Sequence, residues 1–167
     1  PTAEPGVRLS PSAQRTIGAS AMKGVGLVTA GSGSGNPGPG GRGAVLRYQQ
    51  HGKELSGGER ETTNNRMELT AVIEGLRALK MKCSVDIFSD SAYTVNGFLQ
   101  GWVQGWERSG WKKADHKPVL NADLWQELLR LVREHDVRFH KVKGHADTEL
   151  NNRCDELARA AIRALND

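Results

Sequence analysis

The glycine-rich stretch from Gly24 to Gly43, GVGLVTAGSGSGNPGPGGRG, limits the possible folds of this chain more than any other part of the sequence. Its apolar beginning, up to about Ala30, is typical of a buried strand. The residues that follow contain too much glycine and proline for a helix or a regular strand, which predicts a turn. Glycine lets the backbone approach another group closely, and functional sites are often built where strands end. We therefore expect a strand that ends at a functional site.

The rest of the chain alternates between short strand patterns and amphipathic helix patterns. Thr63, Asn64 and Asn65 are polar capping residues in front of a helix expected over 66–80. Further strands are expected at 43–51, 55–62, 84–90 and 137–142, with a hairpin turn at Gly52 and Lys53, and further helices at 91–99, after the capping residue Asn121, and from about 154 to 165. This order predicts an α/β domain in which helices lie on the faces of a mixed sheet.

A chain of 167 residues is long enough for one domain with its own core. We expect residues 1–23, which lack any periodicity, to form a tail or linker remnant, and residues 24–167 to form the domain. No run of 18 apolar residues and no charged-then-apolar leader occurs, so neither a membrane span nor secretion is predicted. Two isolated cysteines favour a reducing compartment, the cytoplasm, and the net charge of +4 favours a polyanionic partner.

Three acidic residues adjoin surfaces that the pattern predicts to be buried. Glu68 lies in the first turn of its helix beside the apolar stripe, Asp90 ends an apolar strand, and Asp155 lies next to the apolar stripe of the last helix. An unpaired carboxylate beside a buried surface is costly unless it holds a cation. Clustered oxygen ligands without Cys or His would favour Mg²⁺ or Mn²⁺ over zinc.

Each of these acids also has a purely structural interpretation. Glu68 could be a capping-box partner of Asn65, and Asp90 could be a turn residue or the N-cap of the next helix. Asp155 could complement the dipole of the last helix. The spacing alone leaves both interpretations open for all three residues.

Five blocks of the sequence stand out along the chain: GSGSGNPGPGG at 31–41, TTNNRMEL at 62–69, SDSAY at 89–93, KGHA at 143–146 and NNRCDELA at 151–158. In sequence and in order they resemble the bacterial-type ribonuclease HI family, whose members cut the RNA strand of RNA–DNA hybrids. The resemblance implies a monomer with an RNase H-like fold, in which a five-stranded mixed sheet is flanked by helices and carries a basic handle. It also implies a site for two Mg²⁺ or Mn²⁺ ions, with Glu68, Asp90 and Asp155 as metal ligands and catalytic residues. His145 would assist the attacking water or product release, although it could also be an ordinary surface residue.

Ala30 departs from the family pattern. The family has T-D-G-S at the end of the first strand, where this chain has Thr29, Ala30, Gly31 and Ser32. The missing aspartate contacts both metal ions in the family, so we expect this chain to cleave hybrids very slowly or not at all. A deliberate Asp-to-Ala change that traps an uncleaved complex is one explanation, favoured because the other motif residues are present. A naturally degenerate, binding-only relative is the other.

The resemblance also indicates how the RNA strand would be read. Backbone groups of the turn at Gly31 and Ser32, together with Asn64 and Asn65, would contact 2′-hydroxyls, by which proteins distinguish RNA from DNA. A side-chain amide both donates and accepts, which suits a hydroxyl group. The two asparagines could instead serve only as helix caps.

On the DNA side, Asn36, Thr63 and Asn121 match family positions that hold phosphate or line the groove. Bacterial members often have an arginine where this chain has Glu61, which predicts a weaker or rebuilt phosphate pocket. The segment 102–117 resembles the basic handle of longer members, and its aromatic and cationic side chains would contact sugars and phosphates. The expected contacts are Trp102, Trp106, Trp111, Lys112 and Lys113. Alternatively, the tryptophans are core residues, above all Trp102 and Trp125.

Two functions therefore stay open for this chain. It is a ribonuclease H domain that binds hybrid and is disabled at Ala30, or a nucleic-acid-binding module that uses the fold without cleavage. An integrase-like or exonuclease-like relative is a third alternative, since one fold hosts many functions, but the NNRCDELA block argues against it.

Overall fold

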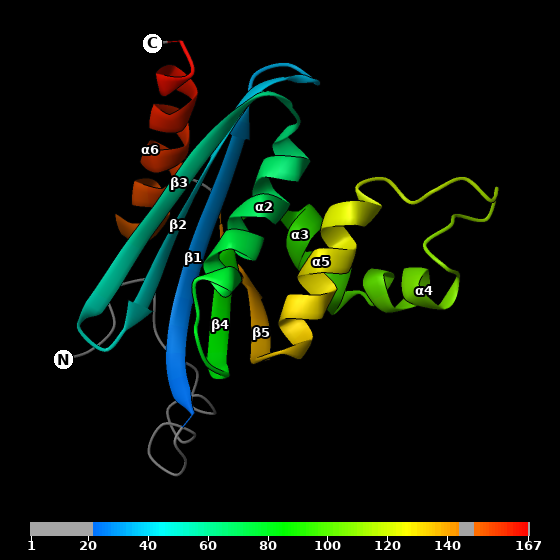
Figure 1. Cartoon of the computed structure of the whole chain (residues 1–167), viewed down its shortest axis with the longest axis horizontal. Helices are drawn as coiled ribbons and strands as arrows, with labels where there is room; N and C mark the ends of the chain where they lie inside the picture. The colour runs from blue at the N-terminus through cyan, green and yellow to red at the C-terminus, as the bar shows by residue number, and fades with distance from the viewer. Residues whose placement is uncertain (1–21, 144–148, 167) are drawn as a thin grey trace.

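A five-stranded mixed sheet forms the centre of the computed structural model, which describes residues 22–143 and 149–166 (Figure 1). The strand order is β3-β2-β1-β4-β5, with β1–β2 and β2–β3 antiparallel and β1–β4 and β4–β5 parallel. The strands are β1 (Lys23–Gly33), β2 (Gly38–Tyr48), β3 (His51–Thr62), β4 (Cys83–Ser89) and β5 (Asp136–Lys141). This confirms the predicted α/β class and the five-stranded mixed sheet.

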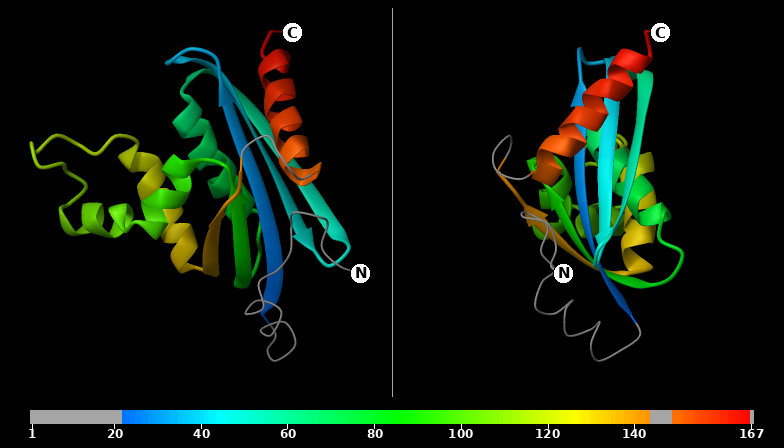
Figure 2. Two further views of the ribbon diagram at one scale, coloured as in Figure 1. Left: turned by 180° about the vertical axis from the view of Figure 1, so that it is seen from behind. Right: turned by 90° about the vertical axis from the view of Figure 1, so that its left-hand side faces the viewer.

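Helices cover both faces of the sheet. On one side, α2 packs on β1 and β2, while α3 and α5 lie over β4 and β5; on the other side, α6 crosses β1, β2 and β3 (Figures 1 and 2). We call these two sides the α2 face and the α6 face. The helices are α2 (Asn64–Arg77), α3 (Ala92–Leu99), α4 (Trp102–Arg108), α5 (Ala122–Arg133) and α6 (Glu149–Ala164). None of the helices among the described residues is long and apolar enough to cross a membrane.

The glycine-rich stretch is mostly strand, and the predicted turn is wrong in its extent. β1 continues through Gly33 and β2 begins at Gly38, and the two pair from Gly31 opposite Arg42 to Gly33 opposite Gly40. Only residues 34–37 connect them. Glycine and proline weaken a strand in isolation, but here the neighbouring strands and helices supply the partners that local propensity lacks.

The glycines in this ladder allow helices to approach the sheet on both faces. On the α2 face, a β-carbon at Gly31 would lie 2.5 Å from the backbone nitrogen of Glu68. On the α6 face, a β-carbon at Gly41 would overlap the carbonyl oxygen of Ala158. We expected the glycine residues to let another group approach the backbone closely. In the structure, the groups that approach are two helices of the same chain, and the glycines lie in strands where a turn was predicted.

Each face of the sheet has its own apolar core. The larger core fills the space between the sheet and α2, α3 and α5, and Trp125 and Leu27 are completely buried in it. The smaller core lies beneath α6 and contains Val28, Ala30, Val45, Leu150 and Cys154. Both predicted isolated cysteines are free thiols and are buried.

Several element boundaries differ from the predicted ones. The hairpin turn lies at Gln49 and Gln50, so that Gly52 is inside β3 and opposite Arg47. α2 begins at Asn64 and ends at Arg77, three residues before the predicted end at Lys80, and α6 begins at Glu149.

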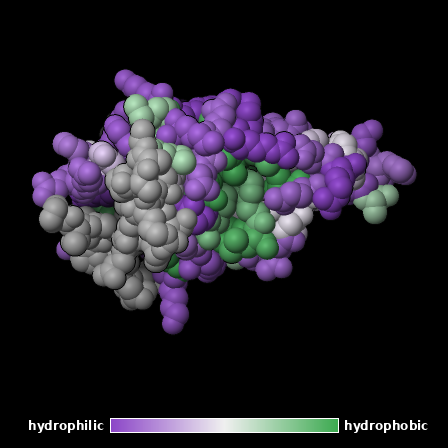
Figure 3. All heavy atoms as spheres, turned by 90° about the horizontal axis from the view of Figure 1, so that it is seen from below, coloured by the Kyte–Doolittle hydropathy of each residue, from purple (hydrophilic) through white to green (hydrophobic). Residues whose placement is uncertain are grey.

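The additional helix α4 was not predicted. It lies within the segment that projects from the body of the protein, at the right of Figure 1. Seen from below, an apolar patch lies near the base of this projecting segment, within a surface that is otherwise mostly hydrophilic (Figure 3).

Candidate nucleic-acid interface and carboxylate site

Three carboxylates from distant parts of the chain line one cavity of about 530 Å³. Glu68 comes from α2, Asp90 directly follows β4, and Asp155 comes from α6. The cavity lies at the carboxyl end of β4 and beside the last part of β1; the two strands are parallel and paired up to Thr29 opposite Ser89. Sites in α/β sheets typically occur at this edge. The remaining lining residues are Gly31, Ser32, Asn64, Asn65, Ser91, Ala92, Tyr93 and Arg159, and we call this space the carboxylate cavity.

Glu68 is the most perturbed of the three acids. Only 5 % of its surface is exposed, and burial together with the negative charges of Asp90 and Asp155 raises its pKa to about 8. Hydrogen bonds from the Gly31 backbone and the Ser91 side chain oppose this shift without cancelling it. Its Oε1 atom has no hydrogen-bond partner within the described part of the chain. A buried carboxylate oxygen of this kind is suited to hold a cation.

The structure excludes the capping roles considered for Glu68 and Asp90. The N-cap of α2 is Thr63, whose hydroxyl accepts from the Arg66 nitrogen, so Glu68 does not complete a capping box with Asn65. The N-cap of α3 is Ser91 and not Asp90.

Asp155 lies in the second turn of α6, whereas the acid in the first turn of this helix is Glu149. A position in the second turn is poorly placed to complement the helix dipole, because that effect falls off within the first turn.

Ala30 is buried within β1 on the α6 face, three residues before the strand ends at Gly33, with 1 % of its surface exposed. Its neighbours in the smaller core are apolar, and the methyl group of alanine packs against them. Within residues 22–143 and 149–166, no group of three or more His, Cys, Asp or Glu side chains is arranged to hold a metal ion. The three carboxylates therefore share a cavity without forming a complete cation site of their own.

A second cavity, of about 350 Å³, adjoins the first around the beginning of α2. It is lined by Gly35, Asn36, Thr63, Asn64, Asn65, Leu120 and Asn121, and we call it the amide cavity. Asn64 and Asn65 line both cavities. No lysine or arginine lines the amide cavity in the described chain, and Glu61 lies exposed on β3.

Asn121 occupies the N-cap position of α5 but does not cap it with its side chain. Its backbone is left-handed, with φ of 61°, a conformation in which asparagine is enriched. The carboxamide instead contacts two other elements: Arg66 donates to Oδ1 at 3.2 Å, and Nδ2 donates to the Tyr93 hydroxyl at 3.1 Å.

The handle, residues 102–117, borders a third cavity of about 610 Å³. Its lining is largely apolar and includes Tyr93, Trp102, Trp106, Lys113 and Leu120; we call it the aromatic cavity. Trp102 is 38 % exposed, so the expectation that it is a core residue is wrong.

Trp125, by contrast, is fully buried, as its core interpretation predicts. Trp111 and Lys112 do not line the aromatic cavity; Trp111 borders a separate surface pocket with Arg133, and Lys112 is exposed.

Sequence reasoning missed two residues at these cavities. Tyr93 is part of the SDSAY block, but nothing in the sequence shows that its ring borders both the carboxylate and the aromatic cavity. Arg159 lies one helical turn after Asp155, a spacing that places both on the same side of α6. His145 lies outside the described residues, as do residues 1–21 of the predicted tail.

Comparisons with known proteins agree with this arrangement. The family model of RNase H matches residues 22–163. The chain is 60 % identical over 143 residues to the ribonuclease H of Symbiobacterium thermophilum, covering 86 % of this chain and 97 % of that protein. It is also 60 % identical over 144 residues to the ribonuclease H of Moorella thermoacetica, covering 86 % of this chain and 95 % of that protein.

Solved structures show the same fold. LC9-RNase H1, described as a type 1 RNase H with the type 2 active-site motif, superposes with a TM-score of 0.77 and 32 % identity, over 86 % of this chain and 74 % of that one. LC11-RNase H1 in complex with an RNA/DNA hybrid superposes with a TM-score of 0.64 and 25 % identity, over 86 % of this chain and 99 % of that one. On the family match, the level of identity and the shared fold, the chain belongs to the RNase H family.

Proposed function

We propose that this chain binds RNA–DNA hybrids through the three adjoining cavities and that, because of Ala30, it cleaves the RNA strand very slowly or not at all. The observation that carries the proposal is the meeting of Glu68, Asp90 and Asp155 around one cavity whose neighbouring position on β1 is an alanine. Support for the substrate comes from the family and from the relative LC11-RNase H1, whose structure contains an RNA/DNA hybrid.

The donor chemistry of the carboxylate cavity suits a hard divalent cation. Its acids offer only oxygen ligands, and the Glu68 Oε1 atom is buried with no partner among the described residues. Glu68, Asp90 and Asp155 would hold Mg²⁺ or Mn²⁺. A pair of such ions, when bound, stabilises the attacking and leaving oxygens of a phosphodiester during in-line displacement.

Ala30 removes one ligand from this set, and no nearby group replaces it. Thr29 points to the α2 face, opposite to Ala30, because side chains alternate along a strand. Ser32 offers only a neutral hydroxyl. Outer partners of metal ligands typically contribute about 10–100-fold to metal affinity or activity, and a direct ligand should contribute more. We therefore expect hybrid binding to survive and cleavage to be lost.

The RNA strand would lie over the carboxylate cavity. Asn64 and Asn65, at the start of α2, line both this cavity and the amide cavity, and Gly31 and Ser32 place backbone groups beside them. Amide groups donate and accept hydrogen bonds, as a 2′-hydroxyl does. Arg159 adds a positive charge at the rim, which suits an RNA phosphate.

The DNA strand would lie along the amide and aromatic cavities. Asn36, Thr63 and Asn121 supply neutral hydrogen-bonding groups to a phosphate, at a site lined by no cationic side chain of the described chain. Trp102 and Trp106 would contact deoxyribose, with Lys113 next to them. Lys112 would contribute to the electrostatic attraction of the handle, and Trp111 would contact the nucleic acid outside the aromatic cavity.

Three further parts of the proposal concern residues or properties outside these cavities. His145 would assist the attacking water or product release in a cleaving relative. A monomer is the proposed functional unit, because one chain supplies all three cavities. The cytoplasm is the proposed location, because both cysteines are free thiols and such thiols persist in a reducing compartment.

The test is cleavage of an RNA–DNA hybrid in Mg²⁺ by the chain and by its Ala30→Asp variant, with Ala30→Asn as a control of the same shape without the charge. We expect cleavage only by Ala30→Asp, faster than the parent by more than about 100-fold. No cleavage by any of the three, with hybrid binding retained, would favour the binding-only module. No binding of hybrid by the parent chain would refute the proposal.

A further inference from the structure

Tyr93 links the parts of the proposed binding surface to one another. It lies in α3, and its side chain borders the carboxylate cavity on one side and the aromatic cavity on the other. Its hydroxyl oxygen accepts two hydrogen bonds, from Asn121 Nδ2 at 3.1 Å and from Trp125 Nε1 at 2.9 Å. Because Trp125 is fully buried, it fixes the position of this hydroxyl.

The contacts of Asn121 determine which way its carboxamide faces. Arg66 donates to the oxygen Oδ1, and a guanidinium can only donate, so the oxygen must point toward Arg66. Asp123 holds the same guanidinium with two hydrogen bonds of 3.0 and 2.7 Å. The amide nitrogen must then point toward Tyr93, where a hydroxyl oxygen accepts one of its two hydrogens.

One hydrogen of the Asn121 amide remains available. No acceptor for it occurs among the described residues, and Asn121 lines the amide cavity. Its backbone has the left-handed φ of 61°, and its side chain does not cap α5, the usual role of an asparagine at that position. The carboxamide is therefore held by Arg66 and Tyr93 at the lining of the amide cavity, with one N–H donor unused.

We propose that Tyr93 is a positioning residue for the DNA strand: its hydroxyl orients the Asn121 carboxamide so that the free N–H donates to a DNA phosphate. This inference rests on the proposed hybrid binding. The same residue also lines the carboxylate cavity, over which the RNA strand is proposed to lie. No cationic side chain lines the amide cavity among the described residues, and Asp123 pairs with the Arg66 guanidinium that contacts Asn121, so the phosphate contact depends on oriented neutral donors.

A purely structural role for Tyr93 leads to a different expectation. In that role its hydroxyl would only accept the hydrogen bond from the buried Trp125 indole. Loss of the hydroxyl would then lower stability and weaken binding by the same factor whether or not Asn121 is present. A positioning role requires that the loss of affinity disappears when Asn121 is absent, because the two residues act on one contact.

The experiment measures hybrid affinity and melting temperature for the parent chain, Tyr93→Phe, Asn121→Ala and the double variant. Tyr48→Phe is the matched control, because Tyr48 is the other of the two tyrosines, its ring lies against Lys23, and it lines none of the three cavities. A second hybrid, with uncharged methylphosphonate linkages in the DNA strand only, serves as a probe for the phosphate contact.

We expect Tyr93→Phe to weaken hybrid binding by about 2- to 10-fold, the usual effect of one lost hydrogen bond. The effect should vanish in the Asn121→Ala background and with the methylphosphonate strand, and Tyr48→Phe should bind like the parent. Unchanged affinity of Tyr93→Phe, or equal weakening with and without Asn121, would overturn the inference while leaving the proposed function standing. If the parent itself does not bind hybrid, the proposed function fails and the inference fails with it.

Discussion

Gly31 of β1 and Glu68 of α2 are in direct contact across the boundary between sheet and helix. A β-carbon at position 31 would lie 2.5 Å from the Glu68 nitrogen, and the Gly31 backbone hydrogen-bonds to the Glu68 carboxylate. Such a short approach is possible only where no side chain intervenes. The glycine therefore allows Glu68 to lie deep beside the sheet, and this burial is the largest cause of its raised pKa, ahead of the negative charge of Asp90.

The stability of the protein should depend on pH through Glu68. Its pKa is raised from 4.5 in the unfolded chain to about 8 in the folded protein, so the folded state keeps a proton that the unfolded state releases. The resulting stabilisation is complete below about pH 4.5 and is lost as the pH rises toward 8. In EDTA, the free energy of unfolding of the parent should therefore fall between pH 5 and 8 relative to that of Glu68→Gln. Parallel curves for the two proteins across this range would contradict the assignment.

Ala30→Asp should destabilise the protein when no divalent cation is present. The new carboxylate would be buried among the apolar neighbours of Ala30, and burying such a group without a partner costs at least about 1–3 kcal/mol of stability. Mg²⁺ should restore most of this loss. Thermal unfolding in EDTA and in Mg²⁺ measures both effects, with Ala30→Asn as the uncharged control. Equal melting temperatures of parent and Ala30→Asp under both conditions would refute the expectation.

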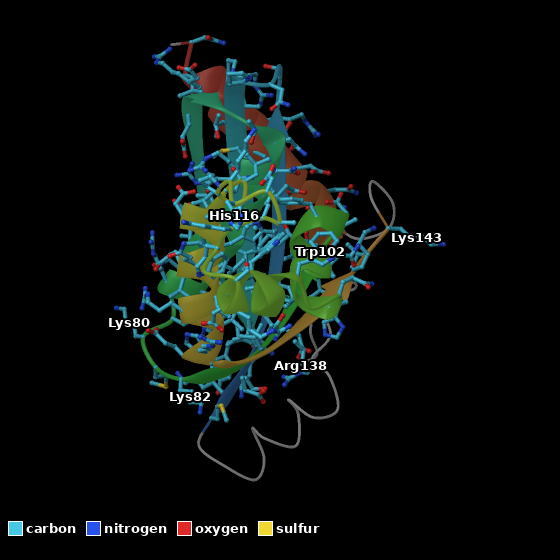
Figure 4. All side chains as sticks on the ribbon, turned by 90° about the vertical axis from the view of Figure 1, so that its right-hand side faces the viewer. Lys80, Lys82, Trp102, His116, Arg138 and Lys143 are labelled. Atoms are coloured by element: carbon cyan, nitrogen blue, oxygen red, sulfur yellow. The ribbon has the colours of Figure 1, made fainter. Side chains whose placement is uncertain are left out.

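Neutralising the handle should reduce the salt dependence of hybrid binding. Lys112 and Lys113 are both exposed there, and replacing both by glutamine should flatten the slope of log affinity against log salt by roughly 1 to 2. Lys80 and Lys82 are the matched control pair, since they are also exposed and lie well away from Trp102 (Figure 4). A slope that changes equally for both pairs would indicate a general effect of net charge and not a contact made by the handle.

Gly41→Ala should destabilise the fold without touching any of the three cavities. The added methyl group would overlap the Ala158 carbonyl of α6, and overpacking of this kind typically costs about 1–3 kcal/mol. Gly105→Ala, inside α4, is the contrasting substitution, because the nearest atom to its new methyl is 3.9 Å away and alanine favours a helix by about 0.5–1 kcal/mol. Chemical denaturation distinguishes them, and a Gly41→Ala protein as stable as the parent would show that α6 can move.

The apolar patterns of the sequence were sufficient to predict the sheet and most helices. Leu69, Val72 and Leu76 recur at helical spacing and are all buried in α2, and the stripe on α5 places Trp125 in the core as expected. These predictions succeed because the spacing of apolar residues within a segment shows which face of that segment is buried. The glycine ladder from Gly31 to Gly43 was misjudged for the opposite reason: its strands are stabilised by contacts with α2 and α6, which are distant in the sequence.

The candidate site was predictable only in part. Motif blocks located Glu68, Asp90 and Asp155, which the fold brings to one cavity. The hydrogen bond between the Asn121 amide and the Tyr93 hydroxyl joins residues 28 positions apart. No pattern of neighbouring residues in the sequence predicts such a contact. Asn121 was expected to cap its helix, and only the three-dimensional structure shows that its carboxamide is turned elsewhere.

The glycine ladder has a consequence for the thickness of the sheet. Gly31 presents no side chain to α2, and Gly41 presents none to α6. Here the two helices, on opposite faces of the sheet, are separated by little more than one layer of backbone. Acids borne by helices that an ordinary sheet would keep apart can thereby reach around the same edge. The positions of the carboxylates thus depend on the absence of side chains at these glycines. Substitutions that added side chains here would push the helices away from the sheet and separate the carboxylates, although every acid would still be present in the sequence.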